Sequence, residues 1–531
     1  MTNRLPIQVF LILLFILNSV YSRDNMLNNS GFESGNTSWD NVKTGNWEYF
    51  APIDGKNYAE SISNSEYTSQ LTSVTIEAGK TYSFTVWARS IYNDDHMEKL
   101  LNNAPDNMPA GVAANTTIET GFFYNDTTKI TFAKRDVSPE ALKGDPREYT
   151  NDDGGNVWVD YEAGYRHGFS ENHFYQKISS DPIYDPWYIS NDNYDEGQNS
   201  SGAKGPVIFN DNKWIFGSNS CNPYCCGSGE ECKATLYFEP ESGGDPDYQW
   251  GTADDQTYVV WHKGDEDPWL ADGQVFYDDD QGRLWMILGG MYFLVCELDT
   301  ATGFVKGHSG PIHYDKNTDD FTQVANWSGD EWTYDSEWME GSALYKHNGY
   351  WYCFGSYGDL SANYTIRVGR GTSPTGPFYD KDGIDMNEYD QDEDEYGNSF
   401  LLGDDAEQLV PGHPHLWEEG DKTYLGYDYR LAKEGQPGAH FDYFGIRRLY
   451  WVNDWPTIWT PITVRFNADH HPDVIGKKLG VRFRNIGENN SRLAVDHTSL
   501  RVYDQGEVPI KHYLNTDTLG HGRISIDPVK D

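Results

Sequence analysis

The segment Lys346–Ser356 reads KHNGYWYCFGS: a polar turn with a glycine is followed by aromatic and small residues that suit a β-strand. Four other segments repeat this pattern: DDGGNVWVDY, NDNKWIFGSN, DDQGRLWMILGG and EEGDKTYLGYD. The aromatic residues of the five repeats are Trp158, Trp214, Trp285, Trp351 and Tyr424. Their intervals of 56 to 73 residues are long enough for four strands and the loops between them. We therefore predict an all-β fold with a five-bladed β-propeller over residues 140–460.

The composition agrees with β structure and limits the function. Aromatic residues make up 15% of the 531-residue chain, and 52 Gly and 24 Pro supply turns, which favours turn-rich β structure over helical bundles. A chain of this length is expected to form two or three domains. The net charge of −43 opposes binding to a phosphate backbone, so no nucleic-acid partner is expected.

The first residues predict export. Arg4 precedes an apolar core at residues 9–17, and Val20 and Ser22 suit the small-residue positions before a cleavage point. This apolar core is too short to span a bilayer, so residues 1–22 are predicted to be a signal peptide. We expect a secreted or periplasmic protein with no membrane partner.

Export also bears on the six cysteines. An oxidising compartment favours one or two local disulfides among the four that lie close together in the sequence. A zinc site is the alternative, although no His lies nearby at ligand spacing. These four are Cys221, Cys225, Cys226 and Cys232. Cys296 and Cys353 lie in apolar, strand-like runs and are expected to be buried thiols.

Acidic residues precede the repeated aromatics in a nearly shared register. Asp145 and Asp272 each lie 13 residues before their aromatic residue, whereas Glu340 and His413 lie 11 residues before theirs. Blade two has Lys204–Pro206 at this place. Because the innermost strand of each blade borders the propeller axis, we expect the three carboxylates and the imidazole to face one another in a funnel.

Three converging carboxylates suit glycoside hydrolysis. An inverting glycosidase uses one protonated carboxyl to donate to the leaving oxygen and one carboxylate to activate water, with the two groups roughly 6.5–9.5 Å apart. A third carboxylate disfavours ionisation of the acid by like-charge repulsion. Asp145, Asp272 and Glu340 are therefore the predicted catalytic residues. The alternative is that they only belong to polar loops, since the chain has 83 Asp and Glu residues.

Four stretches carry a family resemblance: LADGQVFYDDDQGRLWMILGG, MEGSALYKHNGYWYCFGSYG, YTIRVGRGTSPTGPFYDKDGIDMN and PGHPHLWEEGDKTYLGYDYR. Over residues 200–460 the chain resembles the five-bladed glycoside hydrolase family 43, and within it the endo-arabinanase-like branch. The resemblance implies that Glu340 is the general acid and Asp272 the aspartate that tunes it. It also implies that His413 meets a central metal ion or water.

The same resemblance identifies a candidate base. The base of the family is an Asp in an Asp-Pro pair on the first blade, and its best match is Asp145 in KGDPREY. Asp181–Pro182 is a competing pair, but no hairpin follows it at the right distance. The chain departs from the family at Gly273, where many relatives have Pro, and at Lys204–Pro206, where Ala-Pro-Asp is more usual.

Further residues are expected to bind sugar or a cation. His413, Trp285 and Trp351 are expected to contact the substrate. The chemistry requires no cofactor, and the resemblance implies a structural Ca²⁺ or Na⁺ on the axis with His413 beside it. The acidic run Glu388–Phe400 imitates a calcium loop, but it lacks the Gly and the bidentate Glu of such loops, so a solvated surface loop is expected.

The segments on either side of the propeller predict a second β domain. Residues 26–135 and 461–505 resemble the first and second halves of a jelly-roll carbohydrate-binding module, and residues 506–531 follow as a C-terminal tail. Neither half has enough residues to bury a core alone, so we expect one β-sandwich in which the propeller is inserted. Two separate all-β pieces are the alternative. Three aromatic residues either stack on sugar rings or belong to the core: Trp39, Trp47 and Tyr49.

Two functions follow from these features. The first is an exported, monomeric glycoside hydrolase that cleaves arabinose- or xylose-containing, or related, plant or algal polysaccharide by an inverting acid/base mechanism. The alternative is a catalytically inactive, sugar-binding propeller that has lost its base. The distance between Asp145 and Glu340 distinguishes them.

Overall fold

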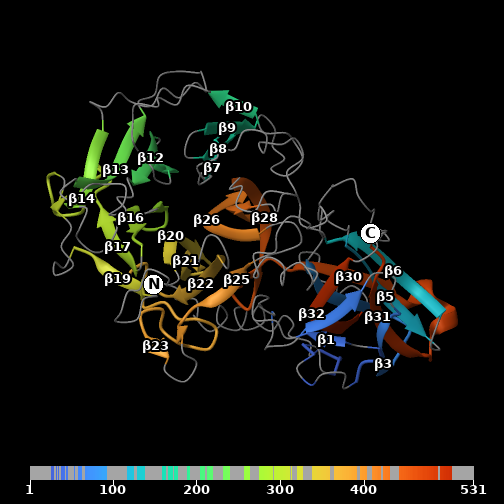
Figure 1. Ribbon diagram of the computed structural model, residues 1–531. Helices are drawn as coiled ribbons and strands as arrows, with labels where there is room; N and C mark the ends of the chain where they lie inside the picture. Colours follow the sequence, from blue (N-terminus) through green and yellow to red (C-terminus); the bar gives the residue numbers. More distant parts are fainter. Residues whose placement is uncertain are drawn as a thin grey trace, which may run out of the picture.

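The computed structural model consists almost entirely of β-strands, arranged as a propeller beside a sandwich (Figure 1). It describes the following residues: 25–28, 31–32, 34, 38–41, 43–45, 53, 58–62, 66–91, 116–124, 128–137, 158–162, 165–170, 173–177, 188–191, 204–209, 212–218, 231–239, 256–263, 274–290, 292–310, 312–313, 320–326, 338–358, 364–390, 395–403, 409–419, 422–430, 442–487 and 491–504.

The propeller has five sheets, and each contains four antiparallel strands in chain order. Blade one contains β7 (Trp158–Glu162), β8 (Tyr165–Ser170), β9 (His173–Lys177) and β10 (Tyr188–Asn191). Blade two contains β11 (Lys204–Phe209), β12 (Asn212–Ser218), β13 (Glu231–Glu239) and β14 (Gln256–Lys263), with β18 (Ile312–His313) added in parallel to β14. Blade three contains β15 (Gln274–Asp278), β16 (Arg283–Leu288), β17 (Tyr292–Leu298) and β19 (Thr322–Asn326).

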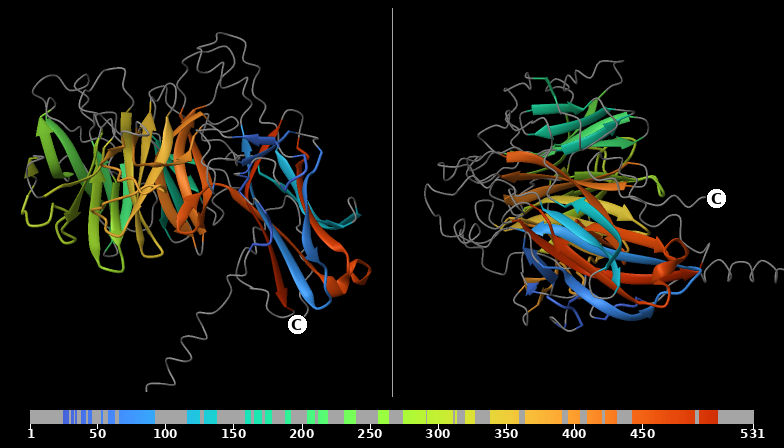
Figure 2. Two further views of the ribbon diagram at one scale, coloured as in Figure 1. Left: turned by 90° about the horizontal axis from the view of Figure 1, so that it is seen from below. Right: turned by 90° about the vertical axis from the view of Figure 1, so that its right-hand side faces the viewer.

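Blades four and five complete the ring. Blade four contains β20 (Trp338–His347), β21 (Tyr350–Gly358), β22 (Thr365–Gly371) and β25 (Ser399–Leu402). Blade five contains β26 (Leu409–Glu419), β27 (Lys422–Arg430), β28 (Asp442–Val452) and β29 (Trp455–Thr457). The first strands of neighbouring blades contact one another, and β26 also contacts β7, which closes the ring around the axis (Figure 1). Figure 2 shows the propeller from the side, next to the sandwich. The predicted five-bladed propeller is confirmed.

The hairpin that indicated the fold forms as expected. β20 and β21 pair antiparallel, with His347 opposite Tyr350 across a two-residue turn. Both turn residues have positive φ, 50° at Asn348 and 84° at Gly349. This is the backbone geometry that an Asn-Gly turn supplies and that matches the twist of the flanking strands.

Blade one departs from the register expected from the repeats. In the other four blades the repeated aromatic residue lies on the second strand, but Trp158 begins β7, the innermost strand of its blade. The spacing of the repeats therefore predicts the number of blades correctly. It assigns the wrong strand of blade one to the position after the turn. Asp145 lies before β7, outside the described residues.

The sandwich combines strands from both ends of the chain. One sheet has the order β1 (Lys43–Gly45), β2 (Tyr58–Ile62), β32 (Arg492–Asp504), β4 (Lys80–Ile91) and β30 (Thr460–Asn467). The other has the order β3 (Thr68–Thr75), β31 (Lys478–Asn485), β5 (Thr117–Tyr124) and β6 (Thr128–Asp136). Two short 3₁₀ turns, η3 (Ala468–His470) and η4 (Pro472–Val474), connect β30 to β31. This interleaving excludes two separate all-β pieces, whereas the domain limits remain predictions.

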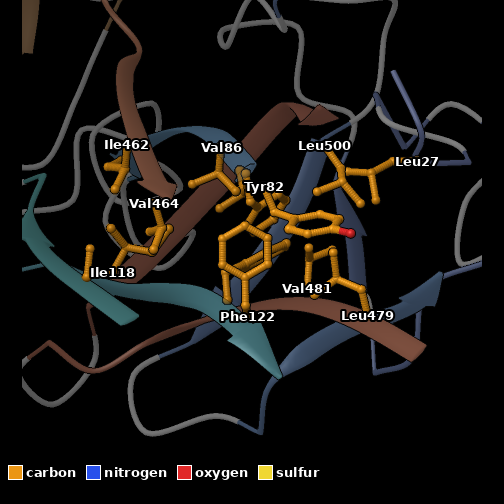
Figure 3. Packing of buried hydrophobic residues seen from close by; sticks show 14 of the residues in the cluster. Leu27, Tyr82, Val86, Ile118, Phe122, Ile462, Val464, Leu479, Val481 and Leu500 are labelled. Carbon is orange, nitrogen blue, oxygen red and sulfur yellow. The ribbon is translucent and has the colours of Figure 1, made fainter. Parts of the chain in front are cut away.

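Apolar side chains from both parts of the chain fill the space between the two sheets (Figure 3). Tyr82 stacks on Phe466 with ring centroids 5.0 Å apart, and Phe122 meets Phe466 edge-on at 4.9 Å. Trp39 is 3% exposed and lies 5.8 Å from Phe483, so its ring belongs to the core and is not a sugar-stacking platform. Trp47 and Tyr49 lie outside the described residues.

Two other predictions concern cysteines and membranes. Cys296 and Cys353 are free and buried, as expected, and burial raises the pKa of both thiols. The side chains of the four clustered cysteines lie outside the described residues. Within the described part of the chain, no helix has the length and apolar character needed to cross a bilayer.

Candidate active site

Glu340 lies near the start of β20, on the innermost strand of blade four. The strand is irregular here: the pairing with β21 shifts between Glu340 and Ala343, and Gly341 has a φ of 60°. A bulge of this kind re-aims a side chain that a regular strand would direct elsewhere. Glu340 is half-buried, and its Oε1 accepts a hydrogen bond from the phenol of Tyr364 at 2.7 Å.

Tyr364 packs against a glycine of the neighbouring blade. Its ring is 3% exposed and lies directly over Gly412 of β26. A Cβ atom at position 412 would lie 2.0 Å from the ring, which no real contact permits. Gly412 therefore allows blade five to approach the residue that contacts Glu340.

His413, the next residue on β26, is also packed against blade four. Its backbone N–H donates to Ser356 Oγ at 2.6 Å, and a Cβ on Gly341 would lie 3.0 Å from its Cα. The side chain is buried, and the φ of 55° is one that non-glycine residues rarely adopt. Such a conformation persists only where the surrounding contacts hold it.

Burial determines the charge of His413. It lowers the pKa of the imidazole from 6.5 to about 3, and neighbouring His415 adds to this shift. The ring is therefore neutral near neutral pH. At that pH it does not act as the acid that protonates a departing oxygen. It can still exchange hydrogen bonds, or offer a nitrogen lone pair to a cation.

A second histidine joins two blades that are not neighbours in the ring. Gln274 Nε2 on β15 and His415 Nδ1 on β26 lie 2.5 Å apart, and both side chains are buried. Because blade four lies between blades three and five, this contact passes across the axial region. Asp272 lies two residues before Gln274, outside the described residues.

Trp285 and Trp351 do not lie where the sequence analysis expected. They are 4% and 3% exposed and pack edge to face at 6.5 Å in the core shared by blades three and four. Trp351 is five residues along β21 from Ser356, the partner of Glu340, which corresponds to about 17 Å. Their position supports a packing role and not the predicted contact with substrate, because aromatic residues at the hairpin turns lie at the end of the blade away from Glu340.

The remaining candidate carboxylates are not all described. Asp145, Asp272, the competing Asp181 and the side chain of Asp428 lie outside the described residues, so their predicted roles stay predictions. Glu388 is exposed, beside a short hairpin formed by β23 (Tyr389–Asp390) and β24 (Glu395–Tyr396).

The expected axial cation also stays a prediction. Within the described residues, no three His, Cys, Asp or Glu side chains come together as a metal site. Neutral His413 offers one nitrogen, but the described donors around it do not complete a coordination sphere. No step proposed below passes through a metal ion.

Much of the propeller sequence also matches a known family. Residues 249–456 match the model of the glycosyl hydrolases family 43. The extracellular exo-alpha-(1->5)-L-arabinofuranosidase of Cellvibrio japonicus is 25% identical over 232 residues, which are 40% of this chain and 58% of that protein. The extracellular endo-alpha-(1->5)-L-arabinanase of Thermotoga petrophila is 31% identical over 182 residues, 33% of each chain.

A solved structure is also similar, the exo-1,5-alpha-L-arabinanase from a bovine ruminal metagenomic library. It aligns with a TM-score of 0.45 and 18% identity over 58% of this chain and 98% of that chain. The match to the two curated relatives thus covers 58% or less of their lengths. Residues 249–456 of this chain are thus similar to the glycosyl hydrolases family 43.

Proposed function

We propose that the protein is an exported glycoside hydrolase that cleaves arabinose-containing polysaccharide, with xylose-containing polymers as the next candidates. The observation that carries this proposal is the position of Glu340. Glu340 lies on an innermost strand, within the residues that match the family 43 model. The next residue, Gly341, packs against the buried, neutral His413 of blade five. The names of the relatives, an arabinofuranosidase and an arabinanase, support arabinan as the substrate.

In the proposed mechanism, Glu340 donates its proton to the glycosidic oxygen as the bond to the anomeric carbon breaks. Asp145 removes a proton from the water that attacks this carbon from the opposite face, which inverts its configuration. Asp272 keeps Glu340 protonated by like-charge repulsion. The names of both curated relatives include the word extracellular, which supports export of this chain as well.

Glu340→Gln tests the proposal, because the amide keeps the shape of the side chain but has no acidic proton. The full-length wild type is assayed on arabino-, xylo- and galacto-oligosaccharides, together with an aryl glycoside whose leaving group is already acidic. We expect cleavage of the oligosaccharide to fall by roughly 10²–10⁴-fold and cleavage of the aryl glycoside to fall less. Equal turnover by the variant and an active wild type on both substrates would show that another carboxylate is the acid.

The inactive sugar-binding propeller remains the second candidate, because blade one departs from the repeat on which the position of Asp145 was based. A wild type that binds arabino-oligosaccharides in calorimetry but releases no product from any substrate in the panel would favour it.

A further inference from the structure

The phenol of Tyr364 contacts Glu340, the proposed general acid. It donates a hydrogen bond to Oε1 of Glu340 at 2.7 Å. The ring is almost completely buried, and it is seated on Gly412, the residue before His413. Packing between blades four and five therefore fixes the position of this hydrogen-bond donor.

This hydrogen bond distinguishes the two oxygens of the Glu340 carboxyl. A protonated carboxyl has one carbonyl oxygen, which accepts well, and one hydroxyl oxygen, which donates. Because Oε1 accepts the phenol O–H, the acidic proton belongs on Oε2. After Oε2 gives up its proton, the same phenol bonds to a carboxylate, and hydrogen bonds to charged groups are stronger than those to neutral groups. The interaction thus gains strength as the proton moves.

We propose that Tyr364 is a positioning residue for Glu340: it directs the transferable proton to Oε2 and stabilises the carboxylate that remains after proton transfer. This inference rests on the proposed role of Glu340 as general acid. The proton moves from Oε2 to the departing glycosidic oxygen while the bond from that oxygen to the anomeric carbon breaks. Tyr364 keeps its own proton throughout and does not touch the substrate.

Tyr364→Phe removes the donor and retains the ring. We expect kcat/KM on an arabino-oligosaccharide to fall about 10-fold with KM nearly unchanged, because the lost interaction is strongest after proton transfer. The phenol favours the ionised form of Glu340, so its loss makes ionisation harder. The alkaline limb of the pH–rate profile should then move upward by roughly half to one pH unit. An aryl glycoside with an acidic leaving group should be nearly unaffected.

Tyr352→Phe is the matched control. Tyr352 is another buried tyrosine of blade four, and its hydroxyl donates to the backbone oxygen of Asp454, with no contact to Glu340. We expect its alkaline limb to coincide with that of the wild type. The effect of Tyr364→Phe should also vanish in the Glu340→Gln background, where no proton is transferred. An unmoved alkaline limb, or an equal loss in both backgrounds, would make Tyr364 merely structural and overturn the inference.

The inference and the proposed function fail in different ways. A wild type that cleaves no substrate contradicts the proposed function. The ionisation of Glu340 is then followed by isotope-edited infrared difference spectra, with Glu340→Gln used to assign the carboxyl band. In this measurement Tyr364→Phe should still move the titration of that band to higher pH, and an unchanged titration would overturn the inference.

Discussion

The candidate site depends on the absence of a Cβ atom at Gly412. Gly412→Ala should displace the Tyr364 ring, since the new Cβ would lie 2.0 Å from it. Overpacking of this kind costs typically about 1–3 kcal/mol of unfolding free energy. We expect glycosidase activity to fall by at least as much as in Tyr364→Phe, because the ring moves as well as the hydroxyl. Urea unfolding and kcat/KM measure the two effects.

Gly310→Ala provides the control for this substitution. Apart from Gly310 and its two chain neighbours, no atom of the described residues lies within 4 Å of the place that a Cβ would take there, and the φ of Gly310 is not positive. An alanine should therefore fit there without strain. Wild-type activity in Gly412→Ala would contradict the packing described for Tyr364.

The sequence located some residues of this site and missed others for a physical reason. Glu340 and His413 were found because each precedes a repeated aromatic residue by the same interval. Tyr364 and Gly412 were missed because their importance comes from a contact between two blades, which no local pattern records. Gln274 could have been found, because residues two apart on a strand share a face and Gln274 follows Asp272 by two.

Single elements were predicted well where the local sequence determines the backbone. The Asn348–Gly349 turn required positive φ at both positions, and the hairpin formed with that geometry. Blade one was harder, because the turn before Trp158 indicates that a strand begins but not which strand of the blade it is. That assignment depends on packing of the strand against β11 and β26, which are distant in sequence.

The outer face of the sheet β3–β31–β5–β6 contains a carboxylate that contributes to stability in a pH-dependent way. Glu119 on β5 accepts hydrogen bonds from the Tyr67 hydroxyl, from Lys129 Nζ at 2.9 Å and from Arg484 Nε at 2.9 Å. Burial alone would raise the pKa of Glu119, but these hydrogen bonds outweigh it and lower the pKa from 4.5 to about 2.

Glu119→Gln should therefore destabilise the sandwich most at neutral pH. A lowered folded-state pKa means that the stabilisation is complete above about pH 4.5, where the unfolded chain is ionised as well, and is lost as the pH falls toward 2. We expect a difference of on the order of 2 kcal/mol in unfolding free energy at pH 7, discounted because Lys129 and Arg484 are partly exposed. Urea titrations of the two proteins should converge toward pH 2.

Exposed Glu77 offers the control for this experiment. Glu77→Gln should leave the unfolding free energy nearly unchanged at every pH. A gap between wild type and Glu119→Gln that stays constant from pH 7 to pH 2 would contradict the assignment.

At the scale of the whole molecule, the sandwich and the propeller share a packed junction. Trp87 of the sandwich meets Tyr450 of blade five edge-on at 5.8 Å, and buried Trp459 lies in the same cluster, in the connection between the two domains. Asp496 accepts a hydrogen bond from the backbone N–H of Ile53 at 2.5 Å near this junction. These contacts place the chain's return from blade five directly against the sandwich sheet.

The order of strands makes the N-terminal part of the sandwich dependent on the C-terminal part. β31 lies between β3 and β5, and β32 lies between β2 and β4, so neither sheet is continuous without the last third of the domain. A chain that ends at Pro461 should therefore expose core side chains such as Tyr82 and Phe122. Each core side chain that becomes exposed costs about 1.5–3 kcal/mol of stability, and several together exceed the 5–15 kcal/mol by which domains are stable.

For the chain that ends at Pro461, we expect limited proteolysis with mass spectrometry to find cleavage throughout residues 66–137. A chain that ends at Asp504 keeps every sandwich strand and should resist the protease there as the full-length protein does. Resistance of residues 66–137 in the chain that ends at Pro461 would mean that the N-terminal strands form a core of their own, against the interleaved sheets described here.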